Sequence, residues 1–136
     1  MTESEHFIGK VAQKAIIEKD NKVLITRYPT DTEWDLPGGR IHRGEKPAAG
    51  LAREIQEELG AAAAVGAPFF VDTFGAQEGD PRYYVVFRAA LQNPNQPLIL
   101  QEEEVAEVYW IGKDEIESKA LFGVCRRALE AHWSGK

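Results

Sequence analysis

The chain has 136 residues and a mass of 15.2 kDa, which is enough for one domain with a hydrophobic core. Its net charge of −6 disfavours non-specific binding to nucleic acid or to an anionic membrane, so a phosphate compound would have to be bound through a metal ion. A single cysteine excludes an internal disulfide. No stretch approaches the roughly 20 apolar residues of a membrane span, and the N-terminus has no signal-peptide pattern, so we expect a cytoplasmic protein.

The N-terminal part of the chain predicts a tail and a β-hairpin. Residues 1–9 are polar and are expected to form a flexible tail. Residues 10–18 and 22–28 are rich in strand-forming residues and flank a Lys-Asp-Asn cluster that favours a turn. Residues 34–36 are expected to be extended, because Pro37 biases the residue before it away from helical geometry.

A helix is expected from Pro47 to Leu59. Proline suits the first helical turn, and Gly60 suits a C-terminal cap. Two positions fit less well, since Lys46 is a poor N-cap and Gly50 costs roughly 1 kcal/mol relative to alanine in mid-helix. Close approach of a loop or a ligand would explain Gly50, and chance is the alternative.

The second half of the chain predicts strands followed by helices. Residues 82–91 form an almost unbroken run of β-formers, which suggests a strand buried on both faces. The last helix has an apolar stripe that includes Cys125, which is therefore expected in the core and not as a nucleophile. These elements predict an α/β domain built in layers. Strands are expected at 69–74, 82–91 and 105–111, and helices at 114–119 and 121–133.

One face of the helix at 47–59 carries three carboxylates. At about 100° per residue, Glu54, Glu57 and Glu58 fall within about a third of its circumference, opposite an apolar stripe. Like charges at this spacing destabilise a helix by a few tenths of a kcal/mol per pair, and Arg53 offsets part of that cost. Clustered carboxylate oxygens are the ligands that Mg²⁺, Mn²⁺ and Ca²⁺ prefer. A solvated charged face is the ordinary alternative.

The spacing around these carboxylates resembles the Nudix box, the signature of the Nudix hydrolases, which include the MutT-like enzymes. The pattern runs from Gly39 through five residues to Glu45, and through seven more to residues 53–61, which read Arg-Glu-Ile-Gln-Glu-Glu-Leu-Gly-Ala. Only Ala61 departs from it, because the family usually has a larger aliphatic residue there. The preceding Trp-Asp-Leu-Pro-Gly also resembles the family's lead-in. The resemblance implies the Nudix fold, a mixed β-sheet sandwiched between helices, with the box as a loop–helix–loop.

The resemblance also implies a reaction and roles for the residues of the motif. Family members typically hydrolyse a nucleoside diphosphate linked to another group, with Mg²⁺ as cofactor and Mn²⁺ as an alternative. By position in the motif, Glu57 and Glu58 are metal ligands, together with the backbone carbonyl of Gly38. Glu54 is a ligand or the catalytic base, and Arg53 orients the carboxylates.

The loop before the helix and the region beyond it supply further acids. Glu45 is expected to hold the loop to the helix. In the family an additional acid often comes from beyond the box, and Glu107, three residues before Trp110, is our first candidate for a metal ligand or a catalytic base. Glu104 is the second candidate for the base, since an acid on a loop is free to swing in.

The glycine pair and several aromatic residues are candidates for substrate binding. Gly38 and Gly39 permit backbone conformations that bring the chain close to a ligand, although a simple turn would use them as well. Aromatic rings could stack on a base, but a place in the core is the more ordinary role for each of them. The candidates are Arg27, Trp34, Gly39, Arg40, Phe74, Tyr83 and Phe122.

The identity of the substrate is weakly constrained by the sequence. We expect (deoxy)nucleoside triphosphates, including oxidised ones, because Pro81 and Tyr83 stand slightly beyond the places where ADP-ribose and dinucleoside polyphosphate enzymes carry their markers. Those two substrates, sugar nucleotides and a non-catalytic nucleotide-binding regulator stay open as alternatives. The partner is expected to be a nucleotide-type small molecule, without stable binding of nucleic acid or membrane. Homodimers are common in the family, but the sequence does not show the quaternary state.

Overall fold

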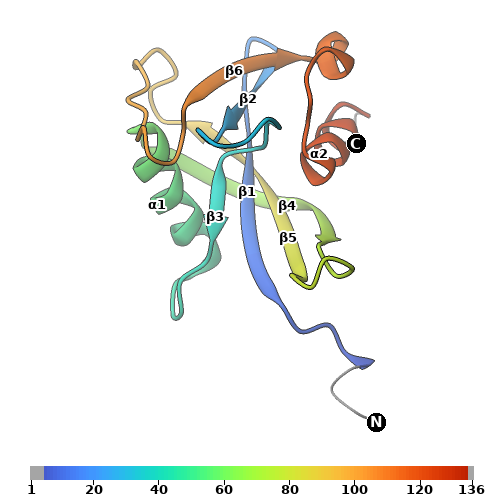
Figure 1. The fold of residues 1–136 in the computed structure, drawn as a ribbon. Coiled ribbons are helices and arrows are strands. Elements are labelled where there is room, and N and C mark those ends of the chain that lie inside the picture. The colour runs from blue at the N-terminus through green and yellow to red at the C-terminus, as the bar shows by residue number, and fades with distance from the viewer. Residues whose placement is uncertain (1–4, 135–136) are drawn as a thin grey trace.

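The computed structural model describes residues 5–134, which are organised around a six-stranded mixed sheet (Figure 1). The strands follow the order β4-β5-β1-β2-β6, and β3 pairs with β1 beside that path. The pairing of β1 with β5 is parallel, and the other pairs are antiparallel. The strands are β1 (Lys10–Lys19), β2 (Lys22–Arg27), β3 (Gly38–Arg40), β4 (Ala63–Phe74), β5 (Arg82–Leu91) and β6 (Glu107–Gly112). The helices are α1 (Pro47–Leu59), the 3-10 helix η2 (Lys113–Ser118) and α2 (Gly123–Trp133).

The two α-helices lie on opposite faces of the sheet, as Figure 1 shows. Side chains alternate along β1, so Ala15 and Ile17 pack into the core that contains Leu51 and Ile55 of α1. Ile16 packs into the core that contains α2. The predicted α/β fold with a sheet between helices is therefore confirmed. No helix in residues 5–134 is long and apolar enough to cross a membrane.

The hairpin and the helices form largely as the sequence predicts. Asp20 and Asn21 have φ values of 53° and 65°, which suits a tight turn between β1 and β2. Helix α1 has the predicted bounds, and Gly60 caps it in the left-handed conformation with φ 62°. Lys46 at the N-cap makes no side-chain capping bond. Cys125 is fully buried, as expected of a core residue.

Strand β4 is longer than predicted, because it begins at Ala63 and not at residue 69. Gly66 and Pro68 interrupt the strand pattern in the sequence, but the register shifts around Pro68 let the pairing with β5 continue. Such irregularities are tolerated because β4 is an edge strand of the sheet.

Three smaller differences lie at the ends of elements. Strand β6 begins at Glu107, since the N–H of Val105 donates to the carbonyl oxygen of Gln101 in the preceding turn at 2.8 Å. The helix predicted at 114–119 is the 3-10 helix η2, and α2 begins two residues later than predicted. The predicted N-terminal tail lies partly outside the described residues. In its described part the ring of Phe7 packs edge-on against the ring of Tyr83, with ring centroids 5.9 Å apart.

Candidate active site

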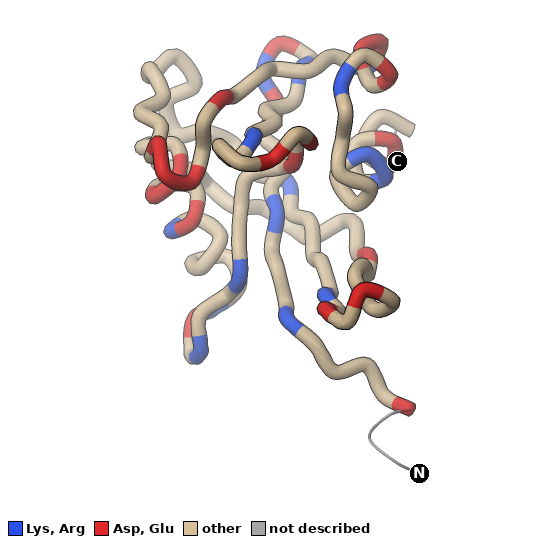
Figure 2. Tube along the Cα trace, in the orientation of Figure 1, with Lys and Arg blue, Asp and Glu red and all other residues tan. Residues whose placement is uncertain are grey.

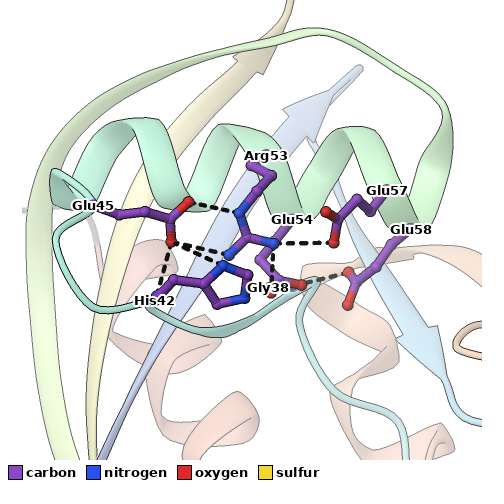
Figure 3. A network of polar contacts seen from close by, with 7 residues as sticks. All are labelled: Gly38, His42, Glu45, Arg53, Glu54, Glu57 and Glu58. Atoms are coloured by element: carbon purple, nitrogen blue, oxygen red, sulfur yellow. Dashed lines mark hydrogen bonds and ion pairs between the residues drawn. The ribbon is translucent and has the colours of Figure 1, made fainter.

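Arg53 of α1 lies at the centre of a network of carboxylates from this helix and from the loop before it (Figure 3). Its Nε donates to Oε2 of Glu45 at 2.6 Å, and its Nη1 lies 3.0 Å from Oε1 of Glu57 and 3.3 Å from Oε1 of Glu54. The hydrogen bonds from Arg53 lower the pKa of Glu45 to about 2. Glu45 also explains Gly50, because a Cβ at Gly50 would lie 3.0 Å from its Oε1. The loop is thus fastened to the helix through Glu45.

Glu58 is the buried member of the acidic face, with 3% of its surface exposed. Its Oε1 accepts a 3.0 Å hydrogen bond from the backbone N–H of Gly38. Burial raises the pKa of Glu58 to about 8, although the charge of Lys14 acts in the opposite direction. A cation beside this carboxylate would therefore stabilise its ionised form.

The two glycines of β3 allow the chain to pass close to its neighbours. Gly38 has a φ of 137°, and a Cβ there would lie 2.1 Å from the carbonyl oxygen of Gln13. At Gly39 a Cβ would lie 2.8 Å from the carboxylate of Glu54. A side chain at position 38 would force β3 away from β1, whereas one at position 39 would displace the carboxylate of Glu54. Gly38 is therefore required for the packing of β3 on β1, beyond what a simple turn needs.

A cleft of about 860 Å³ opens beside these groups, which is a size that accommodates a nucleotide. Figure 2 shows acidic positions on α1 and on the loop before β6, and basic positions spaced along β1 and β3. Both acidic residues, such as Glu54 and Glu104, and basic residues, such as Lys10 and Arg40, line the cleft. Its lining includes Lys10, Ala12, Lys14, Tyr28, Asp31, Glu33, Asp35, Gly38, Gly39, Arg40, His42, Glu54, Arg82, Tyr84, Glu104 and Phe122.

The donor atoms of this site fit a hard divalent cation. Carboxylate oxygens and a backbone carbonyl are the ligands that Mg²⁺ accepts, and the buried carboxylate of Glu58 accepts a single hydrogen bond, from Gly38, in the described part of the chain. As placed, however, no three acidic, histidine or cysteine side chains among residues 5–134 converge on one point. Arg53 holds both Glu54 and Glu57 in ion pairs.

A family model described as the NUDIX domain matches residues 10–130. This chain belongs to the NUDIX family. The predicted membership among the Nudix hydrolases, made from the box alone, is confirmed by a match that extends over most of the chain.

Individual relatives match this chain either over a short stretch or at low identity. The CTP pyrophosphohydrolase of Escherichia coli K12 is 39% identical over 56 residues, which cover 38% of this chain and 42% of that protein. A MutT-like protein of Streptomyces ambofaciens is 28% identical over 118 residues, or 85% of this chain and 71% of the relative. The chain thus spans less than half the length of the first of these curated relatives.

Solved structures of similar proteins agree on the fold. A NUDIX hydrolase from Nitrosomonas europaea superimposes with a TM-score of 0.78 at 22% identity, covering 95% of this chain and 91% of that one. The MutT protein of Methanosarcina mazei Go1 gives a TM-score of 0.78 at 24% identity, covering 93% and 96%. At this level of identity the likeness supports the fold of the NUDIX domain.

Of the two acids proposed from beyond the box, the structure brings Glu104 to the cleft. Glu104 lines the cleft and, with Glu58 and Gly38, a small recess at its base. Burial raises the pKa of Glu104, and the charges of Glu54 and Glu57 add to the shift. Glu107 instead lies on β6 opposite Arg27, whose Nε donates to it at 2.8 Å. Its side chain is not part of the cleft lining in residues 5–134.

Some of the predicted substrate-binding residues line the cleft and others do not. Gly39, Arg40 and Phe122 line the cleft. Within the described residues, the other four are absent from its lining. These are Arg27, held by Glu107; Trp34, packed against Tyr109; Phe74, packed against Phe122; and Tyr83, exposed beside Phe7.

A pair of charged residues in the floor of the cleft was not predicted from the sequence. Nζ of Lys14 lies 3.2 Å from Oδ2 of Asp35, and Lys14 is 8% exposed. Burial alone would lower the pKa of Lys14, but the charges of Asp35 and Glu58 outweigh it and raise that pKa. A signal was present in the sequence, since Lys14 lies between Ala12 and Ile16 on one face of β1.

Proposed function

We propose that this chain is a Mg²⁺-dependent pyrophosphohydrolase that cleaves the phosphoanhydride of a nucleoside diphosphate linked to another group. The observation that carries the proposal is the buried carboxylate of Glu58, on the acidic face of α1, in a small recess that shares lining residues with a nucleotide-sized cleft. The proposed substrates are (deoxy)nucleoside triphosphates, including oxidised ones. Mn²⁺ is the proposed alternative metal, and the cytoplasm the proposed compartment.

Each residue of the site has a proposed role. Glu57, Glu58 and the carbonyl oxygen of Gly38 would hold Mg²⁺, which would neutralise phosphate charge and fix the oxygens in place. Arg53 positions Glu54 and Glu57 through its ion pairs. Glu54 supplies a further ligand or accepts the proton of the attacking water.

Glu104 is the second candidate for the base. It lines the cleft that Glu54 of α1 also lines, and burial together with the charges of Glu54 and Glu57 raises its pKa, which favours proton uptake by a base. Arg40 and Phe122 are proposed to contact the substrate, because both line the cleft.

The names of the relatives support a nucleotide substrate without selecting one. Similar proteins are described as a CTP pyrophosphohydrolase, 8-oxo-dGTP diphosphatases, an ADP-ribose pyrophosphatase and RNA pyrophosphohydrolases. All four descriptions name a nucleotide or a polymer of nucleotides. The domain itself is proposed to act on small molecules, either as a monomer or as a homodimer.

A substrate panel with Mg²⁺ tests this function. Release of phosphate or pyrophosphate is measured with the canonical nucleoside and deoxynucleoside triphosphates, 8-oxo-dGTP, ADP-ribose, dinucleoside polyphosphates and sugar nucleotides. Glu57→Gln and Glu58→Gln are the inactive controls. We expect turnover of nucleoside triphosphates that both variants abolish. Absence of turnover on every compound by the folded protein would contradict the proposal, and nucleotide binding in that case would indicate a regulatory module.

A further inference from the structure

Lys14 is a charged residue in the cleft floor that the proposed reaction does not use. Its side chain is 10% exposed, and its only ion pair in residues 5–134 is with Asp35. It lines both the large cleft and the recess at its base. The ammonium group is therefore buried from bulk solvent but adjacent to the space that a substrate would fill.

Asp35 is held rigidly beside it. Its backbone N–H and carbonyl oxygen are both bonded to Thr26 of β2, at 2.8 and 2.7 Å. One carboxylate oxygen accepts from the N–H of Leu36 at 2.7 Å, and the other faces Lys14 at 3.2 Å. A fixed acceptor therefore lies next to a fixed donor.

Stability alone does not explain this pair. A buried ion pair costs desolvation energy, and well-packed apolar residues often replace such a pair without loss of stability. The flanking residues on the same face of β1 are Ala12 and Ile16, so an apolar residue at position 14 would continue the pattern. The pair therefore has a cost that recognition of a ligand would offset.

An aromatic wall stands beside the ion pair. Phe122 and Tyr84 both line the cleft, with ring centroids 5.9 Å apart. The N–H of Phe122 donates to the carbonyl oxygen of Trp34 at 2.8 Å, which fixes Phe122 next to the segment that carries Asp35. Stacking on aromatic side chains, together with hydrogen bonds to the base edge, is how proteins read an isolated nucleobase.

We propose that Lys14 and Asp35 form the base-recognition site of this cleft, with Lys14 donating to an acceptor on the edge of the nucleobase and Asp35 accepting from the neighbouring N–H. The inference rests on the proposed nucleotide substrate and adds the residues that select the base. The aromatic wall favours a base over a sugar as the occupant. The carboxylate of Asp35 would repel a phosphate placed directly against it, which favours a neutral base edge as its partner.

Binding of products tests the inference without requiring turnover. Dissociation constants are measured by calorimetry with Mg²⁺ for AMP, CMP, GMP, UMP and ribose 5-phosphate, which lacks a base. We expect at least one monophosphate to bind about tenfold or more tightly than ribose 5-phosphate, as one charged hydrogen bond provides. In Lys14→Met and in Asp35→Asn the advantage should shrink to about twofold, while the affinity for ribose 5-phosphate stays unchanged.

Lys10→Met is the matched control, because Lys10 is also an ion-paired lysine that lines the cleft, with Asp80 as its partner. It should keep the preference for a base. If Lys14→Met does not fold, Lys14→Arg and Asp35→Asn carry the test, since Arg keeps the charge but moves the donor. Equal weakening of the monophosphates and ribose 5-phosphate would assign Lys14 to the phosphate and overturn the inference. So would an unchanged base preference in both variants, or no base preference in the wild type.

The hydrolysis assay tests the proposed enzyme and the binding assay tests the base-recognition site, so each proposal can be contradicted independently of the other. Base-selective binding without hydrolysis would retain the inference and overturn the proposed enzyme. Hydrolysis of all nucleotides at similar rates, by the wild type and by Lys14→Met alike, would retain the enzyme and overturn the inference.

Discussion

The backbone N–H of Gly38 donates a 3.0 Å hydrogen bond to Oε1 of Glu58, and this bond joins β3 to the last turn of α1. The bond is buried, and it fixes the one carboxylate of the acidic face that solvent does not reach. In this arrangement Gly38 has a φ of 137° and lies close against the backbone of β1. The position of the proposed metal ligand thus depends on a backbone conformation that suits glycine.

Gly38→Ala should destabilise the protein by on the order of 3 kcal/mol, because strain at positive φ adds to a clash with the carbonyl oxygen of Gln13. Urea unfolding measures the effect. Gly79→Ala is the control, since Gly79 has a φ of 80° but nothing within 4 Å of its Cβ position. An equal cost at both positions would mean that the close packing of β3 on β1 contributes nothing.

Without metal, the free energy of unfolding should fall as the pH rises from 4.5 to about 8, because of Glu58. Burial raises its pKa from 4.5 to about 8, so in this range the unfolded chain releases a proton that the folded chain keeps. The contribution is fully present below pH 4.5 and is lost as the pH passes the folded pKa, at up to about 1.4 kcal/mol per pH unit.

Urea unfolding in EDTA at several pH values measures this dependence. Glu58→Gln should flatten the profile relative to the wild type, and added Mg²⁺ should oppose the loss at high pH, since it binds the ionised carboxylate. Identical pH profiles for the wild type and Glu58→Gln would show that Glu58 titrates normally.

Arg53→Lys should lower kcat about 10- to 100-fold and raise the Mg²⁺ concentration needed for half-maximal activity. Lysine keeps the charge but cannot bridge Glu45, Glu54 and Glu57 at once, so the carboxylates would lose their positions. Arg126→Lys is a suitable control, because Arg126 bridges two carboxylates on the surface away from the cleft. Wild-type activation by Mg²⁺ in Arg53→Lys would argue against a positioning role.

Glu104→Gln should reduce kcat by about 10²-fold or more if Glu104 is the base. The pKa of Glu104 is raised, so wild-type activity should decline on the acid side at a pH above that of an ordinary glutamate, and the variant should lose this limb. The pH dependence of kcat/KM measures it. Glu103→Gln, at an exposed neighbour, should behave as wild type. If Glu104→Gln retains both rate and profile, the base is Glu54.

Local features of the chain were predictable from the sequence. The hairpin at Asp20, the bounds of α1 and the acidic face of that helix depend on contacts within a few residues, and the structure has all three. The extent of β4 was not predictable, because Gly66 and Pro68 break its pattern and only the pairing with β5 restores it.

The site was predictable where the motif fixes its spacing. Arg53 and its carboxylates follow from positions on one helix. The choice between Glu104 and Glu107 depends on the conformation of the loop before β6, which local pattern does not determine. The pairing of Lys14 with Asp35 joins a strand to a distant loop, so only the fold reveals it.

The most direct test of the proposed function is the rate of Mg²⁺-dependent hydrolysis of the preferred nucleotide by Glu58→Gln, compared with the wild type and with Glu78→Gln on an exposed loop. We predict that Glu58→Gln folds, as judged by circular dichroism, and loses at least about 10²-fold in kcat at saturating Mg²⁺. Glu78→Gln should match the wild type. Wild-type kcat in a folded Glu58→Gln would contradict the assignment of the buried carboxylate as the centre of the reaction.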